Sequence, residues 1–148
     1  MPGPEISAKT GHTAMKLPAD AEVYELPNCS FWFDPKGFLC CLCKNTASNL
    51  KETQETFAFL RTLLKDRKVC LLMDATMKLP LDRETSDYMD REIHHYFDAV
   101  AITSDSVLGR IVVKVFLHLK PQRIPIKMFT TEQEGREWLV QYMPSHTN

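Results

Sequence analysis

The hydrophobic pattern along this chain changes its period, and the change predicts an α/β domain. Short alternating or continuous apolar stretches are typical of strands, whereas apolar residues 3.6 positions apart are typical of one helix face. The first part of the chain shows only strand-like stretches, at residues 22–26, 29–33 and 38–43. A tight turn from Asp34 to Gly37 separates the last two, so we expect a β-hairpin there.

From residue 49 onward, helical and strand patterns alternate. Strands are expected at 69–73, 97–103 and 126–129. Helices are expected from Asn49, which with Glu52 forms a capping box, from about Arg83 to His94, after Ser104, and from Thr131. The predicted fold class is therefore α/β: a mixed β-sheet whose N-terminal strands are antiparallel, followed by parallel βα units with right-handed crossovers and about four helices.

The length of the chain and its proline content predict one domain between two tails. At 148 residues, it is long enough to bury a core of its own. Residues 1–20 hold three of the nine prolines and two of the five glycines and lack apolar periodicity, so we expect a flexible tail, within which Met15 is a plausible alternative start. The domain is expected to span residues 21–143, and residues 144–148 form a C-terminal tail.

Composition narrows the function classes. The net charge is −1 and the sequence pI is about 6.5, so no global field favours a nucleic acid or an anionic membrane. The longest apolar runs are too short to cross a bilayer, and no secretory signal is visible. We therefore expect a cytoplasmic protein that does not insert into a membrane.

The five cysteines are expected to be buried, unpaired thiols. An odd number argues against a closed disulfide framework. Cys40, Cys41 and Cys43 are close in sequence and suggest a metal site as the alternative. In a strand, however, Cys41 and Cys43 share one face while Cys40 points to the other, and no second cysteine motif supplies further ligands. The sequence therefore predicts neither a metal nor another cofactor.

Three segments carry a resemblance to a known fold. They are "LLMDAT" with the following "LDRETSDYM", then "FDAVAITSDSVLGRIVVKVFL", and "IPIKMFTTEQEGREWL". Together with the order of the elements from Glu22 to Tyr142, they resemble the STAS fold of anti-sigma-factor antagonists and sulfate-transporter tails. The chain looks most like the compact bacterial STAS/SEC14-type proteins, mostly of unknown function. The resemblance implies a SpoIIAA-like fold and a role in protein–protein interaction.

The family that the chain resembles has a phosphorylation switch, but this chain lacks the serines on which that switch depends. In the antagonists, a partner kinase phosphorylates a serine at the start of the helix after the "LLMDAT" strand, and about −2 charge is added beside free backbone N–H groups. The matching positions here are Asp82, Arg83, Glu84 and Thr85. The acid remains, but arginine and glutamate stand where serines are expected, and Thr85 falls on the apolar helix face. We therefore expect regulation without the usual phosphorylatable serine.

Two groups of residues are candidate sites. The first is an interaction surface at the loop and helix start, made of Thr76, Leu81, Asp82, Arg83, Glu84, Thr85 and Ser86. The second is a polar edge where parallel strands end and helices begin, made of Asp74, Ser104, Asp105, Ser106, Arg110 and Thr130. Such an edge can accept a small anion. The alternative is that these side chains only cap helices, for which serine, threonine and aspartate are the preferred types.

No enzyme motif stands out, so the chain is expected to be non-enzymatic. It has no phosphate-binding loop, nucleophile elbow or zinc-protease motif. An acidic helix near residues 82–92 and a basic zone near 114–127 are complementary in charge, as expected for binding a protein partner or a second copy. The alternative function is binding of a small apolar, lipid-like ligand, because SEC14-type relatives hold such ligands and this chain is rich in Phe, Met and Leu.

Overall fold

One mixed sheet organises the protein. The computed structural model describes residues 15–44, 49–75, 82–104, 107, 110, 111, 114 and 122–143. The strands follow one another in chain order: β1 (Tyr24–Glu25), β2 (Cys29–Phe33), β3 (Leu39–Cys43), β4 (Val69–Asp74), β5 (Phe97–Thr103) and β6 (Ile126–Phe129). The first three strands pair antiparallel and the last four pair parallel. The predicted α/β class and mixed sheet are confirmed.

The helices also begin close to the predicted positions. They are α2 (Leu50–Leu64), α3 (Arg83–Glu92) with the 3-10 helix η1 (Ile93–His95), and α5 (Glu132–Val140). The Asn49 side chain accepts the Glu52 N–H at the start of α2, which is one of the two hydrogen bonds of the predicted capping box. Thr131 and Glu134 form a complete capping box at the start of α5. Three α-helices thus have bounds within the described residues, against the expected count of about four. Four more described residues are helical: Val107, Arg110, Ile111 and Lys114.

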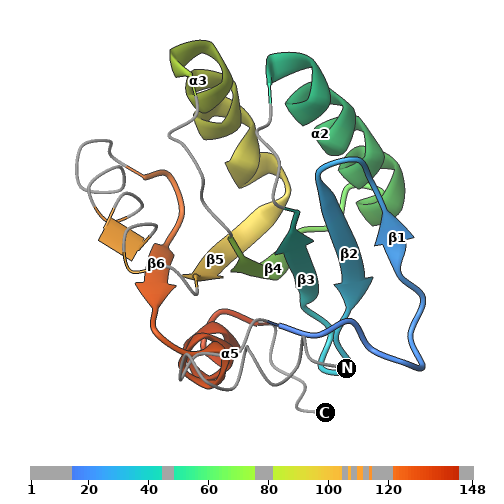
Figure 1. The fold of residues 1–148 in the computed structure, drawn as a ribbon, viewed down its shortest axis with the longest axis vertical. Helices are drawn as coiled ribbons and strands as arrows, with labels where there is room; N and C mark the ends of the chain where they lie inside the picture. Colours follow the sequence, from blue (N-terminus) through green and yellow to red (C-terminus); the bar gives the residue numbers. More distant parts are fainter. Residues whose placement is uncertain are drawn as a thin grey trace.

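Helices cover both faces of the sheet (Figure 1). The two helices α2 and α3 lie side by side on one face, and α5 lies on the other. Both α2 and α3 connect parallel strands that are neighbours in the sheet, and right-handed crossovers place such helices on the same side. Because β4 and β5 are covered on both faces, they are almost continuously apolar, as is usual for central parallel strands.

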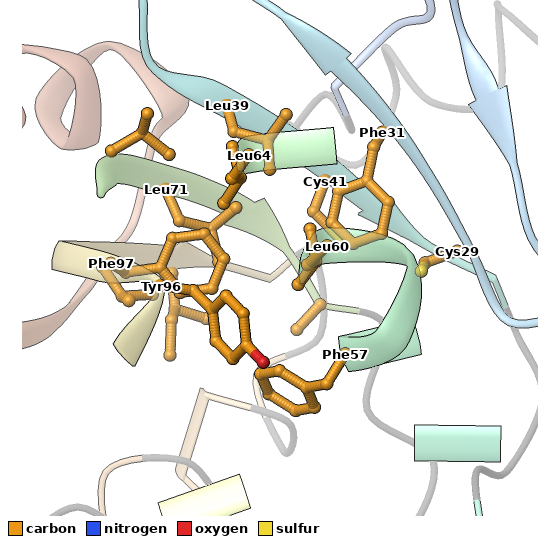
Figure 2. Close-up of a cluster of buried hydrophobic side chains, with 14 of the residues drawn as sticks. Cys29, Phe31, Leu39, Cys41, Phe57, Leu60, Leu64, Leu71, Tyr96 and Phe97 are labelled. Carbon is orange, nitrogen blue, oxygen red and sulfur yellow. The ribbon is translucent and has the colours of Figure 1, made fainter. Parts of the chain in front are cut away.

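The α2 face holds the larger hydrophobic core (Figure 2). Phe57, Leu60 and Leu64 of α2 point toward the sheet, where side chains from β2 to β6 meet them. Phe57 also packs its ring against Tyr96, with 5.3 Å between centroids. Alternation along β2 puts Phe31 on this face and Trp32 on the other, as the period of two predicted.

The opposite face is covered by α5 and by the segment before β1. Leu139 of α5 is fully buried there against Leu72 of β4 and Ala101 of β5. Met15 belongs to the same core and is only 4% exposed. Met15 lies in the segment where the sequence pattern predicted a tail, and burial of its apolar side chain on the sheet face stabilises the fold.

A glycine brings α5 close to the sheet. A Cβ atom at Gly135 would lie 3.0 Å from Leu72 Cδ1 and 3.3 Å from Ala101 Cβ. Arg136, the next residue, donates a 2.7 Å hydrogen bond to Asp34 in the β2–β3 turn and lies over the Phe38 ring. The helix is therefore held both by close packing and by an ion pair to the hairpin.

We expect Gly135→Val to lower the free energy of unfolding by about 1–3 kcal/mol, because its side chain would overlap atoms of the sheet. Gln133→Val, at an exposed position of the same helix, is the matched control and should cost less than about 1 kcal/mol. Urea unfolding of the three proteins measures the difference. Equal losses for the two variants would mean that α5 does not pack this closely.

Candidate functional site

Asp74, a member of the predicted polar edge, lies in a row of aligned residues at the carboxyl edge of the parallel strands. Leu42, Asp74 and Thr103 are aligned across β3, β4 and β5, and Phe129 of β6 continues the row beside Thr103. The Ala75 N–H donates to the Thr103 carbonyl at 2.8 Å, which continues the ladder past the end of β4. Asp74 therefore occupies the centre of this edge.

The carboxylate of Asp74 is buried beneath the N-terminal segment. Asp74 is 1% exposed, and its Oδ2 accepts the backbone N–H of Met15 at 2.7 Å. The two residues are 59 positions apart in the chain. A buried carboxylate needs hydrogen bonds in place of water, and the Met15 N–H supplies one of them. The buried Asp74 carboxylate thus holds the segment that begins at Met15 against the sheet.

The neighbouring polar groups are also used internally. Ser104, at the end of β5, is fully buried, and its carbonyl accepts a 2.8 Å hydrogen bond from Arg110 Nη1. Thr130 follows β6 and is exposed. Asp105 and Ser106 lie outside the described residues. Of the described members of the polar edge, the structure therefore brings Asp74, Ser104 and Arg110 into structural hydrogen bonds, and only Thr130 is freely exposed.

The start of α3 presents a different environment. Asp82 is the N-cap, and its Oδ1 accepts the Thr85 N–H at 2.7 Å. This hydrogen bond lowers the pKa of Asp82 below its ordinary value of 3.8. Arg83 and Glu84 follow on the first turn, and both are exposed. Asp82, Arg83 and Glu84 form a small charged surface, which we call the α3 tip.

The hydroxyl groups behind the α3 tip point inward. Thr85 is fully buried and Ser86 is 5% exposed, so neither side chain is presented to solvent. Burial of Thr85 agrees with its expected place on the apolar helix face. Thr76 and Leu81, the other two members of the predicted interaction surface, lie outside the described residues. The described part of that surface therefore presents charged side chains at the capped start of α3.

A depression that the sequence did not indicate lies at the opposite end of the helices. It encloses about 330 Å³, and charged or polar side chains form most of its wall, among them Arg61, Arg67, Glu92 and His95. Arg61 donates to the hydroxyl of Tyr96 at 3.2 Å. These residues come from separate elements, so no local motif could have revealed them. Their polarity does not favour an apolar ligand in this depression.

Within the residues that the structure describes, no three His, Cys, Asp or Glu side chains are arranged to hold a metal ion. No helix there has the length and hydropathy that crossing a membrane requires.

The sequence of the chain matches one known protein family over most of its length. Residues 31–143, more than half of its length, match a family described as a domain of unknown function, DUF7793. The chain belongs to the DUF7793 family. The matched region runs from β2 to just beyond α5, so it includes the whole parallel part of the sheet. No curated protein matches the chain significantly.

Among solved structures, the chain is similar to an uncharacterized protein of the DUF3478 family from Shewanella loihica PV-4, whose crystal structure is described as having a SpoIIAA-like fold. The two share 16% identity, and the match covers 84% of this chain and 98% of the other, with a TM-score of 0.47. The SpoIIAA-like fold is also the one that the sequence resemblance named. At this distance, the similarity says nothing about function.

We expect Asp74→Ala to destabilise the protein by about 1–3 kcal/mol, because the Met15 N–H would lose its acceptor in a buried place. Asp20→Ala, an exposed carboxylate in the same N-terminal segment, should change the free energy of unfolding by less than about 0.5 kcal/mol. Urea titration monitored by tryptophan fluorescence measures both. If the variants are equally stable, Asp74 does not hold the segment.

The Asp82 cap predicts a pH dependence of known sign. Because the folded-state pKa lies below 3.8, the carboxylate contributes stability above that value and loses its contribution as the pH falls through the folded-state pKa. Wild type should therefore be more stable than Asp82→Asn at pH 7, and the difference should shrink toward pH 3. Urea unfolding of both proteins from pH 7 to pH 3 measures this difference in stability. A difference that does not change with pH would contradict the stabilising role of the Asp82 carboxylate.

Proposed function

We propose that this chain is a cytoplasmic, non-enzymatic regulatory domain that binds a protein partner, or a second copy of itself, through the α3 tip. The proposal depends on one observation: Asp82, Arg83 and Glu84 are exposed at a capped helix start, while the hydroxyls of Thr85 and Ser86 behind them are buried. This arrangement supports a charged contact surface at this place in the fold, and the buried hydroxyls of Thr85 and Ser86 are not accessible to a kinase.

The composition of the α3 tip suits electrostatic recognition. An acid, a base and an acid are presented together, so a complementary partner can form charge-assisted hydrogen bonds that a wrong partner cannot. Farther along α3, Asp90 and Arg91 continue the alternation, and Arg91 lies over the Tyr88 ring. Exposed charges of this kind change association rate and specificity more than stability, so their replacement should leave the fold intact.

The test is a double charge reversal, Arg83→Glu with Glu84→Arg, which keeps net charge and composition. The matched control is Lys51→Glu with Glu55→Lys, a reversal at two exposed positions of α2. Wild type and both variants are used as baits in host lysate, and captured proteins are quantified by mass spectrometry. We expect the α3 reversal to reduce capture of a specific partner at least tenfold, which corresponds to about 1.4 kcal/mol.

Self-association is measured on the same three proteins by sedimentation velocity over a range of concentrations and salt. Loss of a dimer in the α3 reversal alone would identify a second copy as the partner. Circular dichroism checks that all three proteins are folded. If the α3 reversal neither changes the captured proteins nor the oligomeric state, the α3 tip is not the contact surface.

A further inference from the structure

Three thiols lie together at the end of the β2–β3 hairpin that is farthest from its turn. Cys29 begins β2, and Cys41 and Cys43 are in the last part of β3. All three belong to the α2 face of the sheet, and side-chain hydrogen bonds link Cys41 to both of the others. We call them the thiol cluster. Figure 2 shows Cys29 at the rim of the buried core, on the side away from Phe97.

The register of the hairpin puts two of these thiols directly opposite each other. Cys29 pairs with Cys43 across the antiparallel strands. The Lys44 N–H donates to the Asn28 carbonyl at 3.0 Å, which marks the adjacent pair as a hydrogen-bonded position. Because the two kinds of position alternate, Cys29 and Cys43 form a non-hydrogen-bonded pair.

This kind of position is suited to a disulfide. At a non-hydrogen-bonded pair, the Cα atoms are about 4.5 Å apart and the side chains approach more closely than at the other kind of position. Disulfides span Cα separations of about 4.4–6.8 Å, so a bond between Cys29 and Cys43 needs little movement of the backbone. Both cysteines are free thiols in the structure.

The surroundings of Cys29 favour its thiolate. A hydrogen bond with Cys41 lowers the pKa of Cys29, and Lys44 and the Thr56 hydroxyl add to this, together outweighing burial and the nearby Glu25. Lys44 is held in place, since its Nζ donates to the Leu26 carbonyl at 2.7 Å. Cys41 is buried, and its hydrogen bonds with Cys29 and Cys43, together with burial, raise its pKa.

Accessibility differs between the two opposed thiols. Cys43 is half-buried and so can meet a dissolved oxidant, whereas Cys29 is only 6% exposed. An accessible thiol that reacts first and a shielded thiol beside it that attacks the oxidised sulfur are the two parts that a reversible dithiol needs.

We propose that Cys29 and Cys43 form a redox-active pair that closes to a cross-strand disulfide when a hydroperoxide reacts with Cys43. The Cys43 sulfur attacks the terminal peroxide oxygen: an S–O bond forms, the O–O bond breaks, and the leaving oxygen takes up the thiol proton as an alcohol, or as water from hydrogen peroxide. The Cys29 sulfur then attacks the Cys43 sulfur. An S–S bond forms, the S–O bond breaks, and hydroxide leaves with the Cys29 proton as water. In total, the two thiols lose two electrons, and these electrons reduce the hydroperoxide.

The other cysteines serve as internal controls. Burial raises the pKa of Cys40 to about 12 and that of Cys70 to about 11, so both remain protonated at neutral pH. They lie on the α5 face, separated by the sheet from the thiol cluster.

The experiment treats the reduced full-length chain with a small excess of hydrogen peroxide, then blocks the remaining thiols with an alkylating reagent under native and denaturing conditions. We expect three alkylated cysteines in place of five and a disulfide that dithiothreitol reverses. Trypsin cleavage at Lys16, Lys36 and Lys44 separates Cys29 from the peptide that holds Cys40, Cys41 and Cys43. Fragmentation of the linked peptides then locates the bond.

Cys43→Ser should lower the yield of the intramolecular disulfide at least tenfold, while Cys40→Ser should leave it unchanged. Peptide mapping of the wild-type protein gives an answer even if a variant folds poorly. The proposal is overturned if five thiols remain, if Cys43 is oxidised without forming a bond to Cys29, or if the bond joins Cys43 to Cys41 or to another chain.

Discussion

Coverage of both faces of the central strands is the constraint on which the rest of this structure depends. The two inner strands β4 and β5 carry apolar side chains on both sides, so helices or other segments have to pack on each face. The crossovers place α2 and α3 on the first face. Of the helices whose bounds are described, α5 alone lies on the second face. The segment that begins at Met15 packs beside it on that face. Burial of Met15, the close approach of Gly135 and the ion pair of Arg136 all follow from this need.

The same constraint determines which polar groups are available for function. Asp74 and Ser104 are at the carboxyl edge of the sheet, where ligands usually bind in open α/β folds. Here they are buried, and Asp74 binds the backbone of the covering segment. The exposed charge is found instead at the α3 tip, where the capping residue Asp82 and the two charged residues after it are exposed. The described polar groups of the sheet edge therefore lie mostly in the interior, whereas the charged groups of the α3 tip lie on the surface.

The hairpin before the parallel strands adds a feature of another kind. Its register sets a shielded thiol opposite an accessible one, with an ammonium group close to the shielded thiol. The region that matches the DUF7793 family begins at Phe31, within this hairpin. A contact surface on α3 and a dithiol on β2–β3 are separate parts of the molecule, so each can be tested without disturbing the other.

The sequence by itself determined the elements, and the tertiary structure decided which polar groups those elements expose. The periods of two and 3.6 located the strands and helices to within a few residues, and alternation correctly placed Phe31 and Trp32 on opposite faces, because these properties depend on neighbours along the chain. Burial of Asp74 depends on Met15, 59 residues away, and no local pattern records such a contact. Likewise, the depression beside Arg61 and the contact at Gly135 arise only when separate elements pack together, so the sequence could not reveal them.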